Sequence, residues 1–298
     1  MIESIGLVKR FDGVWALDGL TLTVPDGSVF GLVGPNGAGK TTFIRHLAGI
    51  YRQDSGLLRV DGAPVFENES VKAAMSYIPD EVYHFPQAGI REMAEFYSGC
   101  YPRFDWDRFR KLEKIFQLNP KTPIKRFSRG MKKQAAFWLS LCLHPRIMLL
   151  DEPVDGLDPV MRRQIWSLLL GEVEAEGMTV LLSSHNLREL EDVCDHVGII
   201  HKGRTLMQRS LSELQDSMVK LQLVLPEGEE TLPGDLDILH ETKTGRLRTL
   251  ILRGEAKAAE ERLMPLNPLL CEFLPLSLEE IFIYELGGED YAVKDILL

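Results

Sequence analysis

The sequence predicts a two-domain α/β protein in which a parallel sheet forms the centre of the larger domain. A strand-like run, IMLLD, is followed by a helix-like segment, MRRQIWSLLLGEVEAEG, and then by a second strand-like run, MTVLLSSH. This strand, helix, strand order favours a parallel sheet with a right-handed crossover. A chain of 298 residues is long enough for such a domain and a smaller second one. The predicted domains are residues 1–215 and 216–298.

The first domain begins with strand-like runs that alternate with glycine-rich turns, up to about residue 85. LTLTVPDG and SVFGLVG have the apolar pattern of strands, and KTTFIRHLAGI has that of a helix. Apolar residues then recur at helical spacing, which predicts a mostly helical insert at about residues 86–143. HVGIIHKGRTL predicts a hairpin around Lys202 and Gly203.

The second domain has a different pattern. VKLQLVL, DLDILHE and RLRTLILRG alternate like the strands of an exposed sheet, and the helix-like segments EAKAAEERLM and SLEEIFIYEL follow them. We therefore expect a small α+β domain at the C-terminal end.

Composition and charge restrict the class of protein. The net charge of −10 argues against a general nucleic-acid binder, which is usually basic. The four cysteines lie far apart without metal-type spacing, which favours a reduced, cytosolic chain. The start of the chain lacks a secretory apolar region, and no apolar run reaches the ~18 residues of a membrane span. We expect any membrane role to come through a partner.

The strongest motif is GPNGAGKTT, which fits the phosphate-loop pattern after a predicted strand and at the start of a helix. Glycines allow backbone N–H groups to turn toward phosphates, and the helix N-terminus adds positive potential. Lys40 is expected to reach the β- and γ-phosphate oxygens, and Thr41 to ligate Mg²⁺. The predicted nucleotide-binding residues of this loop are Gly34, Pro35, Asn36, Gly37, Ala38, Gly39, Lys40, Thr41 and Thr42.

Polar residues follow two further strand-like runs. Asp151 and Glu152 come directly after IMLL, and His185 ends the run LLSSH. Open α/β sheets bind ligands at the carboxyl ends of their strands, so these side chains should lie beside the phosphate loop. We predict that Asp151 is a Mg²⁺ ligand, that Glu152 is the general base that polarises the attacking water, and that His185 lies within reach of the γ-phosphate.

Over roughly residues 1–215, these motifs resemble those of the ATP-binding cassette (ABC) family, the nucleotide-binding subunits of ABC transporters. GPNGAGKTT is similar to the Walker A motif, IMLLDE to Walker B, GLDP with Asp158 to the D-loop, and SSHNL to the switch histidine. The resemblance implies a P-loop NTPase (RecA-like) core with an antiparallel β subdomain and a helical insert. It also places Phe11 where the family stacks an aromatic ring on adenine, although a single Phe at such a position can equally be a core residue.

The segment FSRGM occupies the place of the family's signature motif, usually written LSGGQ. Ser128 and Gly130 match the motif, whereas Phe127, Arg129 and Met131 depart from it. In the family this turn opens a helix and faces the ATP held by the other subunit, so that two subunits clamp two nucleotides. From the residues alone, the basic turn could also be a solvated start of a helix.

A larger departure follows the strand-like MSYI, where the family places a Gln that touches Mg²⁺. This chain has Asp80 there. We predict that Asp80 ligates Mg²⁺, which would offset its negative charge near the γ-phosphate. It could instead point away from the site, or weaken ATP binding by repulsion. The next segment, VYHFPQAGI, is a candidate surface for a membrane partner, or a packed loop.

The resemblance implies an ATPase that uses ATP and Mg²⁺, pairs with a second nucleotide-binding subunit of the same or another kind, and powers separately encoded permease subunits. It would then lie at the cytoplasmic face of the membrane without binding nucleic acid. The ending SLEEIFIYEL resembles exporter-type cassettes for drugs or peptides, so we expect export. One alternative is a soluble ABC ATPase acting on ribosomes or DNA, although the second cassette or long coiled coil of such proteins is not found. A P-loop kinase or GTPase is another, but the Asn-Lys-x-Asp guanine motif is missing.

Overall fold

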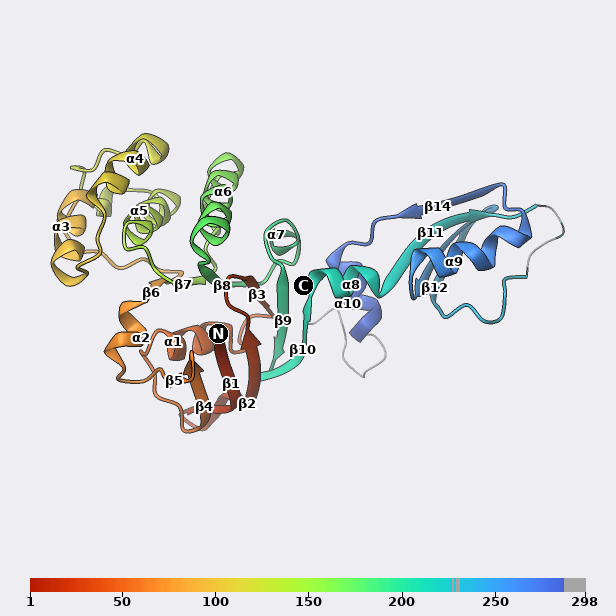
Figure 1. The fold of residues 1–298 in the computed structure, drawn as a ribbon, viewed down its shortest axis with the longest axis horizontal. Helices are drawn as coiled ribbons and strands as arrows, with labels where there is room; N and C mark the ends of the chain where they lie inside the picture. Colours follow the sequence, from red (N-terminus) through yellow and green to blue (C-terminus); the bar gives the residue numbers. More distant parts are fainter. Residues whose placement is uncertain (227, 229–230, 287–298) are drawn as a thin grey trace. The chain divides into compact units, whose positions relative to one another are not determined.

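A computed structural model describes residues 1–226, 228 and 231–286, and these residues form two compact units (Figure 1). The first unit is Met1–His185 with Val193–Gln208, and the second is Asn186–Asp192 with the described residues from Arg209 onward. The boundary predicted near residue 215 falls inside helix α8 (Leu211–Asp216). The last part of the predicted second domain, residues 287–298, lies outside the described residues.

The first unit is built around a six-stranded sheet in the order β10-β9-β3-β8-β7-β6. Strands β9, β3, β8, β7 and β6 pair in parallel, which confirms the predicted parallel sheet. All residues of β3, β7 and β8 are buried, as expected for strands covered on both faces. The bounds are β3 (Val29–Val33), β6 (Met75–Ile78), β7 (Ile147–Asp151), β8 (Thr179–Ser184), β9 (His196–His201) and β10 (Arg204–Ser210).

The second sheet of this unit has the order β2-β1-β4-β5, and its strand pairs are antiparallel. Its two longest strands meet at a tight turn where Asp12 and Gly13 both have positive φ, as a type I′ hairpin requires. The buried side chains of this sheet and of α1 form one hydrophobic core. The elements are β1 (Ile2–Phe11), β2 (Val14–Val24), α1 (Lys40–Leu47), β4 (Ser55–Val60), β5 (Ala63–Pro64) and α2 (Glu69–Ala73).

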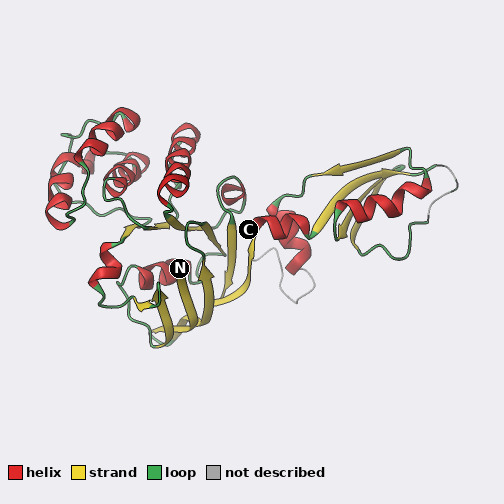
Figure 2. Cartoon of the chain, in the orientation of Figure 1, coloured by secondary structure: helices red, strands yellow, loops and turns green. Residues whose placement is uncertain are grey.

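The predicted helical insert lies between β6 and β7, and Figure 2 shows its helices grouped together. Trp138 organises its core: the indole stacks on Phe109 at a ring-centroid distance of 4.7 Å and lies 6.2 Å from Phe116. The indole N–H also donates to the Phe109 carbonyl at 2.9 Å, so this buried polar group is satisfied. The helices are α3 (Ile90–Cys100), α4 (Trp106–Phe116), η1 (Ile124–Arg126) and α5 (Arg129–Leu141).

Capping residues stand at both ends of the remaining helix of this unit, α6 (Pro159–Glu176). Asp158 caps its start by accepting hydrogen bonds from the backbone N–H groups of Val160 and Met161, and Pro159 stands at the first helical position. Gly177, at φ 64°, ends the helix.

The second unit contains a four-stranded antiparallel sheet in the order β12-β13-β11-β14. Leucines of β11 and β13 pack with Leu263 of α9 in its core. The sequence patterns did not predict β14, a short edge strand. The elements are α7 (Arg188–Glu191), β11 (Met218–Val224), β12 (Ile238–Thr244), β13 (Leu247–Arg253), α9 (Ala256–Leu263), η2 (Met264–Leu266), β14 (Leu270–Leu274) and α10 (Leu278–Leu286).

Helix α7 belongs to the second unit because its side chains contact α10. Arg188 donates to Glu279 through Nε and a terminal guanidinium nitrogen, at 3.1 and 3.0 Å. The backbone N–H of Leu278 donates to the carboxylate of Glu191 at 3.3 Å. Throughout the described residues, no helix is both long enough and apolar enough to cross a membrane.

Candidate functional site

The phosphate loop connects the end of β3 to the start of α1, and close packing fixes two of its glycines. A Cβ at Gly34 would lie 2.2 Å from the carbonyl oxygen of Ile200. Gly39 has φ 110°, and a Cβ there would lie 2.7 Å from the carbonyl oxygen of Ala16. Neither position can hold a side chain without a shift of backbone. The loop therefore keeps its N–H groups at the N-terminus of α1, where an anion is favoured.

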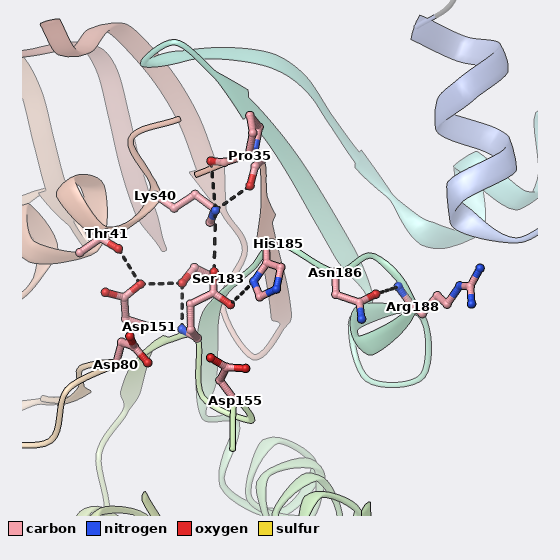
Figure 3. A network of polar contacts seen from close by, with 12 residues as sticks. Pro35, Lys40, Thr41, Asp80, Asp151, Asp155, Ser183, His185, Asn186 and Arg188 are labelled. Carbon is pink, nitrogen blue, oxygen red and sulfur yellow. Dashed lines mark hydrogen bonds and ion pairs between the residues drawn. The ribbon is translucent and has the colours of Figure 1, made fainter. Parts of the chain in front are cut away.

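Lys40 is the first residue of α1, and only 6% of it is exposed. Its Nζ donates to the carbonyl oxygens of Gly34 at 2.6 Å and Pro35 at 3.3 Å, and lies 3.8 Å from Oε1 of Glu152 (Figure 3). Burial lowers the pKa of Lys40 and outweighs the opposite effect of the Glu152 and Asp151 charges. The ammonium is thus held inside the loop, and its principal acceptors are neutral carbonyls.

Asp151 ends β7 and is almost fully buried, with 1% exposure. Its Oδ1 accepts hydrogen bonds from the hydroxyls of Thr41 at 2.9 Å and Ser183 at 2.7 Å. Carboxylate and hydroxyl oxygens are hard donors of the kind that Mg²⁺ prefers. In the described part of the chain, no group of three or more His, Cys, Asp or Glu side chains could hold a metal alone. The adjacent oxygens of Thr41 and Asp151 fit an ion of this kind, which would take its other oxygens from a bound phosphate ligand.

Glu152 and His185 leave neighbouring strands, β7 and β8, and meet at the edge of the sheet. Nδ1 of His185 lies 2.9 Å from Oε2 of Glu152. The backbone N–H of Glu152 donates to the Ser183 hydroxyl at 3.1 Å. The pairing of Asp151 with Ser183 in the sheet register explains this arrangement. Sequence reasoning did not assign Ser183 a role, although that register could have suggested one.

Asp80 lies just beyond β6 and lines the same cavity as Thr41 and Asp151. Its Oδ1 accepts hydrogen bonds from Arg129 at 2.7 Å and from Lys133 at 3.2 Å. Burial acts to raise the pKa of Asp80, but the two cations outweigh it and hold that pKa below its ordinary value. Neither cation was predicted from the sequence as a partner of Asp80. The negative charge that was expected to face the γ-phosphate is therefore balanced within the chain.

The signature turn starts α5, where the Ser128 hydroxyl accepts from the backbone N–H of Met131 at 3.2 Å. A Cβ at Gly130 would lie 2.5 Å from the carbonyl oxygen of Gly156, so the turn packs closely on the GLDP segment. Arg129 also bonds to Asp155 of that region, at 3.1 Å. Hydrogen bonds and ion pairs, with Ser183 as the link between Asp151 and Glu152, thus join one group of residues: Lys40, Thr41, Asp151, Glu152 and His185. The side chains of Ser128 and Asp158 instead cap helices.

Phe11 ends β1 and has 38% of its surface exposed, so it is not a core residue. Its ring meets Tyr51 edge to face at a centroid distance of 5.1 Å, and Nζ of Lys9 lies 5.3 Å from its centroid. Tyr51 was not identified from the sequence. An exposed, laterally supported ring can stack on a base, so the adenine role of Phe11 stays a prediction.

Comparisons with known proteins agree with this geometry. The family model for ABC transporters matches residues 17–155. The ABC transporter ATP-binding protein YtrB of Bacillus subtilis (strain 168) is 29% identical over 97% of this chain and 99% of its own. The daunorubicin/doxorubicin resistance ATP-binding protein DrrA of Streptomyces peucetius is 36% identical over 73% of this chain and 67% of its own. The bacitracin transport ATP-binding protein BcrA of Bacillus licheniformis is 30% identical over 72% of this chain and 71% of its own.

Solved structures give the same fold. A structure described as the ATP binding subunit of an ABC transporter has a TM-score of 0.67 and 26% identity, covering 72% of this chain and 92% of that one. A dimeric ATP-binding cassette with bound ADP and Pi has a TM-score of 0.64 at 19% identity, covering 71% and 99%, which supports the fold alone. These likenesses and the site geometry show that the chain belongs to the ABC transporter family, as an ATP-binding and ATP-hydrolysing subunit.

Proposed function

We propose that Glu152 is the general base of ATP hydrolysis and that His185 holds its carboxylate in place. The observation that carries this is the 2.9 Å contact between Nδ1 of His185 and Oε2 of Glu152, beside the ammonium of Lys40. A carboxylate in this position can accept a proton from the water that attacks the γ-phosphate. Lys40 can then balance the negative charge of the phosphate oxygens.

Mg²⁺ belongs to this proposal as the partner of ATP. Thr41 and Asp151 would hold it, because their oxygens already lie side by side. Asp80 lines the same cavity, but its Oδ1 already accepts hydrogen bonds from Arg129 and Lys133, so its role as a third ligand stays a prediction and is not part of this proposal. When bound, the ion would neutralise phosphate charge. The chain's own part is to bind the phosphates through Lys40 and to position the base.

The complete site would require two cassettes. Ser128 and Gly130 lie on a turn at the N-terminus of α5, with backbone N–H groups and a hydroxyl that suit an anion. We assign this turn, with Asp158, to the nucleotide held by a second cassette, of the same or another chain. Closure on ATP and opening after hydrolysis would then convert the reaction into movement.

That movement would drive a separately encoded permease at the cytoplasmic face of the membrane, most simply for export. The names of DrrA and BcrA refer to drug resistance and bacitracin transport, which supports export by analogy. The segment VYHFPQAGI, the candidate surface for the permease, carries exposed rings. Tyr83 is 74% exposed, and its ring centroid lies 6.3 Å from that of Phe85, which in turn lies 5.0 Å from the ring centroid of Phe96 on α3. Exposed aromatic clusters of this kind are typical of interaction sites.

The variant Glu152→Gln tests the base and the dimer together. It keeps the size of the side chain and removes the proton acceptor, so hydrolysis should fall by about 10²- to 10⁴-fold while ATP still binds. Size-exclusion chromatography with ATP should show a dimer that persists. Adding Ser128→Trp should prevent that dimer and spare ATP binding. Hydrolysis near the wild-type rate would remove Glu152 from its role.

Cofractionation tests the permease. The ATPase should follow the membrane fraction only when an export permease is co-expressed. Phe96→Glu should weaken that association, while the ATPase activity of the isolated chain stays intact, because Phe96 is exposed and does not line the cavity of Thr41 and Asp151. Association with ribosomes instead of the membrane would favour the non-transport alternative.

A further inference from the structure

Lys133 lies in the basic run that follows the signature turn, yet it is fully buried, with 0% exposure. Its Nζ makes two contacts with segments that are distant in sequence. It donates to Oδ1 of Asp80 at 3.2 Å and, through a shorter contact, to the backbone carbonyl of Glu152. A buried ammonium is costly unless it is paired and hydrogen-bonded. The buried ammonium of Lys133 is therefore held by two specific acceptors.

The contact with Glu152 matters because the backbone of that residue is strained. Glu152 has φ 47°, in the left-handed region that side chains other than glycine rarely adopt. Its N–H is fixed by the Ser183 hydroxyl at 3.1 Å, and its carbonyl by Lys133. The two peptide groups that flank its Cα are thus both held by side chains. The direction of its carboxylate toward His185 depends on this backbone.

Asp80 and Lys133 differ in burial, which shows how the contact is arranged. The side chain of Lys133 is 1% exposed, while those of Asp80 and of its second partner, Arg129, are 45% and 57% exposed. The pair of Asp80 with Arg129 is exposed on both sides, so water screens it and it contributes little. The pair of Asp80 with Lys133 has a buried member, and the charge of Asp80 keeps the buried ammonium of Lys133 in place.

We propose that Lys133 is a positioning residue for ATP hydrolysis, which holds the backbone of Glu152 in its hydrolytic conformation, and that Asp80 acts through Lys133. This rests on the proposed role of Glu152 as the base. The acid at position 80 is then part of a chain of contacts, from Asp80 to Lys133 to Glu152. Its effect on turnover passes through the protein and does not require direct contact with Mg²⁺.

The test is Lys133→Met, which keeps the length of the side chain and removes the ammonium. Turnover should fall, by up to about 10²-fold, because the base loses its fixed position. The dissociation constant for ATP, measured by calorimetry, should stay within about three-fold, because the hydrogen bonds of Lys133 go to Asp80 and the Glu152 carbonyl and not to the phosphate loop. Lys111→Met on α4, an exposed lysine of the same unit, should change neither value. A variant with wild-type turnover would overturn the proposal.

Variants of Asp80 distinguish an effect that passes through Lys133 from a direct contact with Mg²⁺. Asp80→Asn keeps an oxygen for Lys133 and should retain most turnover, whereas Asp80→Ala should resemble Lys133→Met. The double variant Asp80→Ala with Lys133→Met should be no slower than Lys133→Met alone, because the two residues act on one target. Additive losses, together with a Mg²⁺ requirement that only the Asp80 variants change, would overturn the proposal.

Two outcomes distinguish this inference from the function on which it rests. If Glu152→Gln still hydrolyses ATP, the assignment of the base fails. If Glu152→Gln is inactive but Lys133→Met is not, only the positioning role fails. Thermal unfolding of each variant checks that it is folded at the assay temperature. A rescue of Lys133→Met by lower temperature alone would indicate a merely structural role and would count against the proposal.

Discussion

The first unit, which contains the nucleotide site, has two buried lysines, Lys40 and Lys133, and their hydrogen-bond acceptors differ. Lys40 and Lys133 are 6% and 0% exposed, and burial lowers the pKa of both. Lys40 donates to two carbonyls of its own loop and stands 3.8 Å from the nearest carboxylate oxygen. Lys133 donates directly to a carboxylate and to the carbonyl of the proposed base.

The difference lies in the acceptors. Lys40 has weak, neutral partners, so an anion with more charge can replace them at small cost. Lys133 already has a charged partner, Asp80, and a second acceptor, the Glu152 carbonyl. Removing its ammonium takes a donor from both, although Asp80 keeps its hydrogen bond from Arg129. A buried cation that donates to neutral carbonyls and has its nearest carboxylate 3.8 Å away is suited to binding a ligand, whereas one that donates directly to a carboxylate is suited to fixing structure.

The largest effect is expected from Lys40→Ala, because Lys40 is the buried lysine that is expected to bind the nucleotide. The variant removes the ammonium that faces the phosphates, so turnover should fall by at least about 10²- to 10³-fold and most ATP affinity should be lost. Calorimetry and a phosphate-release assay measure both. Lys111→Ala is the matched control. ATP binding at wild-type strength would contradict the phosphate-loop assignment.

The structural role of Lys133 is tested by measuring the free energy of unfolding. Lys133→Met should lower the free energy of unfolding by about 1–3 kcal/mol, because Asp80 and the Glu152 carbonyl lose a donor. Adding Asp80→Ala should recover part of this loss. Thermal unfolding with and without ATP gives a second contrast: ATP should still raise the midpoint of Lys133→Met but not that of Lys40→Ala. Equal behaviour of the two would remove the distinction between them.

Mg²⁺ titrations of the ATPase reaction distinguish two roles of Asp80, as a direct Mg²⁺ ligand or as the partner of Lys133. If Asp80 is a direct ligand, Asp80→Gln should shift the Mg²⁺ requirement by a few-fold relative to wild type, roughly the effect of one weakened ligand contact. If it acts through Lys133, the requirement should match wild type while turnover changes. The two readings therefore separate in one series of curves.

The smallest expected effect belongs to Phe11, at the other end of the nucleotide. Phe11→Ala removes the ring that is expected to stack on adenine. It should raise the dissociation constant for ATP by roughly two- to ten-fold, without a change in the rate of hydrolysis at saturating ATP. Tyr51→Ala, which removes the lateral support at 5.1 Å, should give a smaller loss of the same kind. A loss in saturated turnover instead would place Phe11 outside adenine binding.

Much of the fold was predictable because its signals are local. The phosphate loop, the buried strand before Asp151 and the strand before His185 are each written in one short stretch, and parallel strands bring their carboxyl ends to one edge. Lys133 and Asp80 are 53 positions apart and lie on different elements. A lysine in a basic run predicts a solvated helix face, and only the packing of α5 shows otherwise.

The second unit was less predictable for a related reason. β14 (Leu270–Leu274) is an edge strand with no fully buried residue, so its alternation is faint. The boundary between the units is also not a single point. The segment Asn186–Asp192 joins the second unit through side-chain contacts that no local pattern reveals.

The tie between α7 and α10 has a practical meaning for dissecting the chain. The peptide that carries His185 runs directly into Asn186, and within a few residues Arg188 and Glu191 are bonded to α10. A fragment cut after Gln208 would contain each sequence motif of the nucleotide site, yet it would release the C-terminal side of the histidine loop. The shortest piece that hydrolyses ATP at the full rate should therefore extend through α10.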